Sequence, residues 1–334
     1  MRVFCTLFDS NYIDKGLVLY YSMERVMKDF KLYIFAFDDL CRDILTNMNL
    51  KNAIIIGLEE FETDTMLKVK KERSRAEYCW TCTPISIEYV LEKYGEPICT
   101  YIDSDLYFFA DPGLLLDEIK DDTMSVLLTE HRFAPNKRGL QAMKKNGKYC
   151  VQFNSFKNEV NGMEVLKWWK EKCLEWCFFR HEDNRMGDQK YLEGWTDTFK
   201  GVHELQHLGG GVAPWNLAQY TLIKNKKQIL LKEKSTNIEF PLIFYHFQNI
   251  RYISHDIANI RSQCREIPLK KSIYEPYLRE IEKIRAELKT KYNLTISIDK
   301  FCSNNKFVAF IQKNIMKYKT SDLTDIINLK NLRD

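Results

Sequence analysis

The sequence predicts an α/β protein whose mostly parallel sheet carries helices on both faces. Over the first hundred residues, short apolar runs typical of buried strands alternate with segments of helical periodicity. This strand–helix–strand order is typical of parallel sheets. Near residue 216 the pattern of predicted elements changes, and a long charged helix is predicted after it. We therefore expect a nucleotide-binding and catalytic core over 1–216 and a mainly helical C-terminal extension over 217–334.

The predicted elements follow one another in a regular order. Short apolar runs predict strands at 3–8, 31–37, 53–56, 98–102, 124–128, 149–156 and 240–247. Apolar residues spaced three or four apart predict helices at 16–28, 40–48, 85–94, 163–179 and 273–292. A loop over 9–15 joins the first strand to the first helix. Gly95 marks the end of the predicted helix at 85–94.

Composition narrows the class of protein. Hydrophobic residues make up 45% of the 334, which is enough for a core and excludes a disordered chain. With 50 Lys and Arg against 46 Asp and Glu, the net charge of +4 argues against a dedicated nucleic-acid binder. Ten cysteines, several inside apolar runs, are typical of a reducing compartment. No apolar run could span a bilayer, so we expect a cytoplasmic protein.

Two carboxylates, Asp103 and Asp105, directly follow the predicted strand 98–102. Open α/β sheets bind their ligands at the carboxyl ends of strands. Carboxylate oxygens suit Mn²⁺ or Mg²⁺, which in turn bind phosphate oxygens. An Asp-rich turn without a metal is the alternative, but the apolar flanks and the position at a strand end favour a metal site.

A rival metal pattern is His203-Glu204-Leu205-Gln206-His207, which matches the H-E-x-x-H of zinc peptidases. That chemistry needs both histidines on one face of a helix. Gly201 and the glycines from 209 to 211 leave barely two turns between helix-breaking residues. We interpret the segment as a short strand or loop, with a zinc metallopeptidase as the alternative function.

Two further patterns are weaker. Cys79 and Cys82 form a C-x-x-C, but not at the start of a helix after a first strand, so unreactive thiols are favoured. A haloacid-dehalogenase-type phosphatase also places D-x-D after a strand. Such an enzyme usually uses the first strand and has Thr or Val where this chain has Tyr107.

Five motifs occur in order along the chain: Asp9-Ser10-Asn11-Tyr12, Asp103-Ser104-Asp105, Phe153-Asn154, Asp188-Gln189 and His246-Phe247. This ordered set resembles glycosyltransferase family eight, the GT-A fold family that includes glycogenins and bacterial lipooligosaccharide galactosyltransferases. The chain departs from the family pattern at Ser155 and Phe156, where small residues are usual, and at Asn249, where the family has Gly.

The segment 125–216 is more similar still to a bacterial group of sugar transferases encoded with surface-polysaccharide genes. The signs are His131-Arg132-Phe133, Trp168-Trp169, Glu175-Trp176-Cys177, Gly187-Asp188-Gln189-Lys190-Tyr191-Leu192 and Ala213-Pro214-Trp215-Asn216. In that group, 203–207 aligns with a strand-like run. The resemblance implies a Rossmann-like GT-A sheet that binds a nucleotide diphosphate sugar.

The resemblance also implies a site. Asp103 and Asp105 would hold Mn²⁺ or Mg²⁺ with His246 as the third protein ligand; a core histidine is the alternative for His246. A divalent cation stabilises the diphosphate leaving group of a UDP-sugar. The acceptor would be a saccharide or lipid-linked sugar in bacterial surface glycan synthesis. A non-catalytic nucleotide-sugar-binding protein is the remaining alternative.

Donor contacts are expected from the first loop and its surroundings. Tyr12 offers a face for stacking on uracil, or else packs within its loop, and Asp9 and Asn11 offer hydrogen bonds to base or ribose. Ser104 is assigned to the donor site between the two aspartates. Arg75, together with Arg73, could bind the phosphates bidentately, or belong to a solvated basic face.

The resemblance implies a retaining transfer, with Gln152 or the pair Asp188 and Gln189 near the anomeric carbon. An inverting enzyme would instead need a carboxylate base, and Asp188 could serve. Along 300–319, lysines surround apolar residues in a pattern that predicts an amphipathic helix. That helix would either touch the inner face of an anionic membrane, as a peripheral contact, or pack on the catalytic domain.

Overall fold

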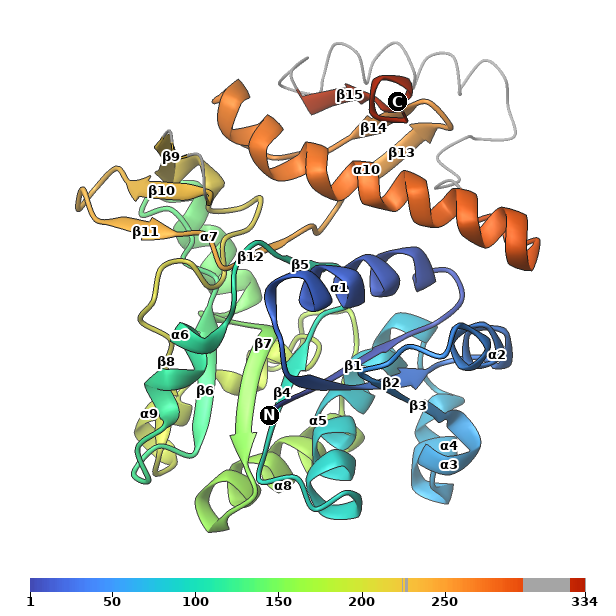
Figure 1. The fold of residues 1–334 in the computed structure, drawn as a ribbon. Helices are drawn as coiled ribbons and strands as arrows, with labels where there is room; N and C mark the ends of the chain where they lie inside the picture. Colours follow the sequence, from blue (N-terminus) through green and yellow to red (C-terminus); the bar gives the residue numbers. More distant parts are fainter. Residues whose placement is uncertain (224, 226–227, 297–324, 334) are drawn as a thin grey trace.

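The computed structural model describes residues 1–223, 225, 228–296 and 325–333, and a seven-stranded sheet forms its centre (Figure 1). Its strands, in spatial order, are β3 (Ala53–Gly57), β2 (Phe30–Ala36), β1 (Arg2–Phe8), β4 (Ile98–Ile102), β7 (Tyr149–Lys157), β6 (Val126–Glu130) and β8 (Val202–Glu204). Every neighbouring pair is parallel except the two that β7 makes. The predicted mostly parallel α/β sheet is confirmed.

Helices cover both faces of this sheet. They are α1 (Ile13–Val26), α2 (Asp39–Met48), α3 (Leu58–Phe61), α4 (Asp64–Lys70), α5 (Arg75–Lys93), α6 (Gly113–Leu116), α7 (Lys137–Asn146), α8 (Val160–Glu175), α9 (Trp195–Thr198) and α10 (Ile267–Tyr292). Because side chains alternate along a strand, Phe4 of β1 packs in one core with α1 and α2, while Cys5 packs in the other with α5 and α8.

Several predicted boundaries differ from the structure. Helix α1 begins inside the predicted loop, and α5 begins well before residue 85, because Ser74 and Glu77 form a reciprocal capping box there. The predicted strand 240–247 is two short strands, β11 (Glu239–Pro241) and β12 (Phe244–His246). Strand β12 pairs antiparallel with β5 (Leu106–Phe108), which follows β4 almost directly.

The predicted C-terminal helix is present as α10, but small sheets that we did not expect lie beside it. Their further strands are β9 (Tyr220–Ile223), β10 (Leu230–Glu233), β13 (Arg251–Ser254), β14 (Ile257–Asn259) and β15 (Ile326–Asn328). Arg285 of α10 pairs with the fully buried Asp14 of α1, with 2.7 Å between Nε and Oδ2. The predicted helix at 300–319 lies outside the described residues. Among those residues, no helix combines the length and hydropathy needed to cross a membrane.

Candidate active site

The carboxyl ends of β1 and β4 open into a cavity of about 1020 Å³. Among the residues predicted for the site, those that line it are Asp9, Asn11, Tyr12, Arg75, Asp103, Ser104, Asp105, Asp188, Gln189 and His246. They come from five separate stretches of sequence. The position agrees with the rule that open α/β sheets bind ligands where their parallel strands end.

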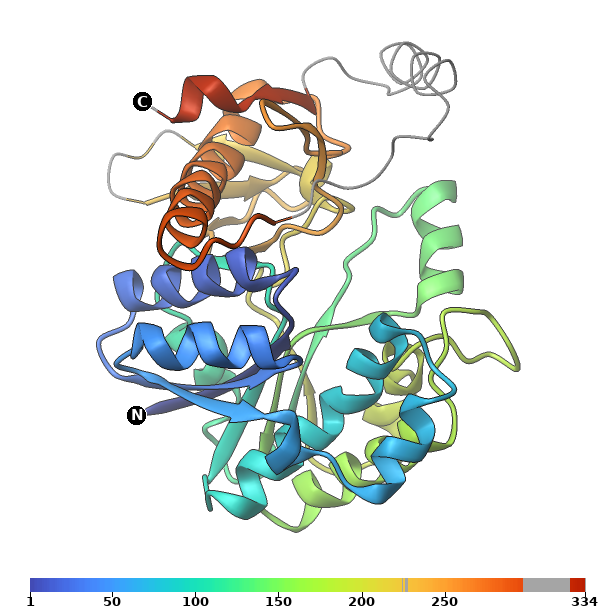
Figure 2. The same ribbon diagram turned by 90° about the vertical axis from the view of Figure 1, so that its right-hand side faces the viewer.

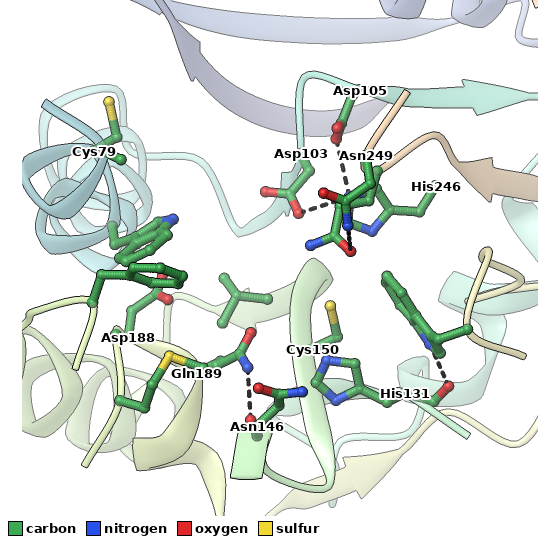
Figure 3. Close-up of a pocket in the computed structure, with 18 of the residues that line it drawn as sticks. Cys79, Asp103, Asp105, His131, Asn146, Cys150, Asp188, Gln189, His246 and Asn249 are labelled. Carbon is green, nitrogen blue, oxygen red and sulfur yellow. Dashed lines mark hydrogen bonds and ion pairs between the residues drawn. The ribbon is translucent and has the colours of Figure 1, made fainter. Parts of the chain in front are cut away.

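Asp103, Asp105 and His246 point toward one another at one wall of this cavity (Figure 3). The two aspartates follow β4, and the pairing of β12 with β5 places His246 opposite Leu106. His246 Nε2 lies 3.0 Å from Asp105 Oδ1 and 3.7 Å from Asp103 Oδ2. One ligand atom from each residue lies within 4.8 Å of the others. Two carboxylates and an imidazole are a donor set that suits Mn²⁺ and related divalent ions.

Gln152, which we predicted to lie near the reacting carbon, is not among the residues that line the cavity. Its side chain is fully buried on β7, and its Oε1 lies 2.9 Å from His246 Nδ1. An amide oxygen only accepts, so His246 donates from Nδ1 and turns Nε2 toward the aspartates. This contact orients the ring of His246, as outer hydrogen-bond partners do for the imidazoles that bind metals.

Burial and the nearby charges shift the pKa values of the acidic groups in the site. Burial, together with the nearby charges of Asp105 and Asp188, raises the pKa of Asp103 to about 7 against the opposing charge of His246. Burial also works against ionised Asp105, but His246 outweighs it and holds the Asp105 pKa below its usual range. Burial raises the pKa of Asp188 to about 7. Such a concentration of buried negative charge suits a bound cation.

A turn after β1 presents the predicted donor-binding residues. Asp9 Oδ1 accepts hydrogen bonds from the backbone amides of Asn11 at 2.8 Å and Tyr12 at 3.2 Å. Tyr12 is 46% exposed at the edge of the cavity. Arg75 pairs with Asp9 and, at 2.7 Å, with Asp38 Oδ2. Arg75 thus anchors the turn while still facing the cavity.

The prediction that Arg73 binds the phosphates is wrong. Arg73 is buried, and its guanidinium donates to the backbone carbonyls of Cys173 at 2.8 Å and Leu174 at 2.9 Å. It joins the start of α5 to the end of α8. A different cation lies near the turn: the ammonium of Lys15 is 3.6 Å from the centre of the Tyr12 ring.

One wall of the cavity is aromatic, which the sequence did not predict. The rings of His131 and Phe133 stack with their centres 4.6 Å apart, and the Trp215 indole donates to the His131 carbonyl at 2.7 Å. Burial lowers the pKa of His131 to about 4, so its ring is neutral. Trp215 also meets His246 edge-on at 5.4 Å. The motifs containing these residues were visible in the sequence, but no chemical signal tied them to one wall.

The H-E-x-x-H segment forms no metal site. His203 lies on the short strand β8, and its Nε2 is 2.8 Å from Glu118 Oε2. Glu204 pairs with Lys148, and His207 Nδ1 accepts from the amide of Gly209. In the part of the chain that the structure describes, Asp103, Asp105 and His246 form the one His/Cys/Asp/Glu group close enough to share an ion. The strand interpretation of this segment is confirmed.

Cys79 and Cys82 lie on α5 with their backbones already helical. Burial raises the pKa of Cys79 to about 12 and raises that of Cys82 well above the usual range. A thiol that holds its proton so firmly is a poor nucleophile. These values agree with the interpretation of the pair as unreactive thiols.

Comparisons with known proteins place the chain among bacterial relatives. No protein-family profile matches it. Two proteins of Bacillus subtilis (strain 168) are similar to this chain over most of their length. "Uncharacterized protein YfnF" is 31% identical, over 87% of this chain and 96% of YfnF. "Uncharacterized protein YfnD" is 28% identical, over 86% of this chain and 91% of YfnD. Mouse xyloside xylosyltransferase 1 has 12% identity and a TM-score of 0.45, covering 74% of this chain and 98% of that one. The galactosyltransferase LgtC has 14% identity and a TM-score of 0.46, covering 75% and 89%.

Proposed function

The chain belongs to the same protein family as Bacillus subtilis YfnF, and we propose that it is a metal-dependent glycosyltransferase of the GT-A type. It would move a sugar from a nucleotide diphosphate sugar, a UDP-sugar, to a saccharide or lipid-linked acceptor. The observation that carries the proposal is the Asp103–Asp105–His246 group at the wall of a large cavity beyond the ends of parallel strands. The ordered motifs of the sequence support the same reaction.

Asp103, Asp105 and His246 would hold Mn²⁺ or Mg²⁺, which when bound neutralises charge on the diphosphate leaving group. The protein's own part is to fix the ring of His246, because the hydrogen bond from Nδ1 to Gln152 aims Nε2 at the aspartates, where a bound cation would take the place of its proton. Ser104, between the aspartates, also faces the cavity and is proposed as a donor-binding residue.

The turn after β1 would hold the nucleoside. Tyr12 presents an exposed ring at the cavity edge for stacking on uracil, and Asn11 offers hydrogen bonds to the ribose or base. Asp9 accepts from two backbone amides and pairs with Arg75, so its main role in this proposal is to order the turn. Arg75 is half exposed and lines the cavity, where it is proposed to contact the donor phosphates.

Asp188 and Gln189 lie on another side of the same cavity and are proposed to face the anomeric carbon. Gln189 Nε2 donates to the Asn146 carbonyl at 2.6 Å, which fixes the orientation of its amide. We propose retention of configuration from the family resemblance. In the alternative, inverting reaction, the Asp188 carboxylate accepts the acceptor hydroxyl proton, and its pKa of about 7 suits that step near neutral pH. Analysis of the product anomer by NMR distinguishes the two.

We place the reaction in the cytoplasm, in the synthesis of bacterial surface glycans. The described cysteines are all free thiols, and most are buried, as is usual in a reducing compartment. A non-catalytic sugar-nucleotide-binding protein would use the same cavity and release no nucleoside diphosphate.

A panel of nucleotide sugars tests the proposal. The protein with Mn²⁺ is screened for a rise in melting temperature, since a ligand bound only by the folded state stabilises it by mass action. The donors that bind are then incubated with the protein, and released nucleoside diphosphate is measured. We expect the protein to bind sugar donors of one nucleotide class and to release nucleoside diphosphate slowly, by transfer of the sugar to water. Binding without release in the presence of any acceptor saccharide would support the non-catalytic alternative, and no binding would refute both.

A further inference from the structure

Helix α7 carries two different faces. Its residues Arg138, Ala142 and Asn146, spaced four apart, line the cavity. On the remaining circumference are the residues that we call the outer face of α7: Lys137, Leu140, Met143, Lys144 and Lys145. In Figure 2 this helix, coloured green, stands apart from the sheet at the edge of the molecule, joined to it by extended segments.

The apolar part of this face is uncovered. Leu140 is 55% exposed and Met143 is 39% exposed, one turn apart on the helix. Exposed leucine and methionine side chains occur singly on many surfaces, but here both project from one short helix that lines the cavity with its other side. Both therefore leave more than a third of their surface open to solvent.

The charged part is unpaired as well. Helix α7 contains Lys137, Arg138, Lys144 and Lys145 and no acidic residue. Within the described part of the chain, none of these four cations forms an ion pair. Lys148, just beyond the helix, does pair with Glu130 at 2.8 Å and with Glu204. The helix thus presents concentrated positive charge on a protein whose net charge is only +4.

We propose that the outer face of α7 is a contact surface for an anionic lipid bilayer. Leucine and methionine would enter the boundary between headgroups and acyl chains, while the lysines contact lipid phosphates. A nucleic acid or an acidic protein would use the charge but gain little from two apolar side chains set among the lysines. The combination of both on one helix face fits a membrane surface best.

The place of α7 has a consequence that rests on the proposed function. Because the inner side of the helix lines the cavity, a bilayer touching the outer face lies at the cavity rim. A lipid-linked acceptor, held in that bilayer, would reach the site without leaving the membrane. This contact is separate from the predicted one at 300–319, so the two can be tested apart.

Co-sedimentation of the full-length protein with vesicles tests the surface. Vesicles of phosphatidylcholine alone are compared with vesicles containing phosphatidylglycerol, at low and high salt. The charge variant is K137Q/K144Q/K145Q, and its matched control, K28Q/K51Q/K68Q, removes three exposed lysines elsewhere. The apolar variant is L140S/M143S, and its control, L114S/V160S, changes two exposed apolar residues elsewhere.

We expect binding to anionic vesicles only, reduced about tenfold or more in the charge variant and severalfold in the apolar variant, with both controls like the wild type. If K137Q/K144Q/K145Q binds anionic vesicles as strongly as the wild type does, the proposal is overturned, whether or not another segment binds vesicles. A loss in the charge variant with none in L140S/M143S would also overturn it, in favour of a purely electrostatic partner. Metal-dependent UDP binding, measured on the same variants, should be unchanged; its absence in every form would count against the proposed function and not against this surface.

Discussion

His246 donates a hydrogen bond from Nδ1 to the side-chain oxygen of Gln152, 2.9 Å away, behind the residues that line the cavity. This contact fixes which imidazole nitrogen faces the aspartates. Nε2 is left facing Asp105 and Asp103 at 3.0 and 3.7 Å, where a cation would be held. A glutamine on β7 thereby prepares a histidine on β12 that is more than ninety residues distant in sequence.

Replacing Gln152 should therefore weaken metal binding without touching a metal ligand. We expect Gln152→Leu to lower the affinity for Mn²⁺ by about 10- to 100-fold, the range found when outer hydrogen-bond partners of metal ligands are lost. Gln152→Glu keeps an acceptor for Nδ1 and should restore most of the affinity. Titration calorimetry with Mn²⁺ measures both. Equal affinity in the leucine variant and the wild type would show that this contact does not prepare the site.

Asp105→Asn should remove the metal site and leave the fold intact. Asp105 supplies a charged oxygen, whereas its main structural contact, the bond from the Phe247 amide to the Asp105 carbonyl, belongs to the backbone. We expect Mn²⁺ binding and sugar transfer to fall by about 100-fold or more while the melting temperature of the metal-free protein changes little. The matched control is Asp111→Asn, which makes the same substitution on an exposed loop. Unchanged turnover in Asp105→Asn would refute the assignment.

Tyr12→Ala should weaken nucleotide binding more than it slows the reaction. Stacking of an aromatic ring on a base contributes about 1–3 kcal/mol in nucleic-acid binders, equivalent to roughly a 5- to 150-fold loss of affinity. Tyr12→Phe keeps the ring and should stay close to the wild type. Steady-state kinetics with varied donor concentration separates the two effects. If KM for the donor stays constant and only kcat falls, Tyr12 does not hold the base.

His203→Ala should leave metal binding and transfer unchanged. His203 contacts Glu118 from a strand and lies apart from the aspartate cluster. Metal analysis of the purified variant and an activity assay check this together. Loss of a tightly bound, stoichiometric zinc ion in this variant would revive the peptidase hypothesis.

Asp188 should make the metal-free protein less stable as the pH rises. Its pKa in the folded protein is about 7, because burial disfavours the charged form, whereas an unfolded aspartate titrates near 4. Between these values the folded state holds a proton that the unfolded chain has lost, so raising the pH weakens folding by up to about 4 kcal/mol. Asp188→Asn lacks this group and should show a flatter dependence.

Urea unfolding between pH 4.5 and pH 8, with a metal chelator present, measures both slopes. The difference in the free energy of unfolding between Asp188→Asn and the wild type should shift in favour of the variant as the pH rises. Parallel curves would mean that Asp188 titrates normally in the folded protein.

The sequence was most informative where one segment acts alone. The short apolar runs of β1 to β4 and the Asp103–Asp105 pair at a strand end could be predicted, because an apolar run and a strand-end position are local properties. The interaction of Gln152 with His246 could not, because it depends on β12 joining β5 across the molecule. For the same reason the buried role of Arg73 was missed, since its partners at the end of α8 are distant in sequence.

Metal-dependent binding of UDP tests the central claim most directly. UDP is titrated into the wild-type protein and into Asp105→Asn by calorimetry, once with Mn²⁺ and once with a chelator. We expect the wild type to bind UDP about tenfold or more tightly with Mn²⁺, and Asp105→Asn to show no such gain. Equal UDP affinity with and without Mn²⁺, or the same gain in Asp105→Asn, would contradict it.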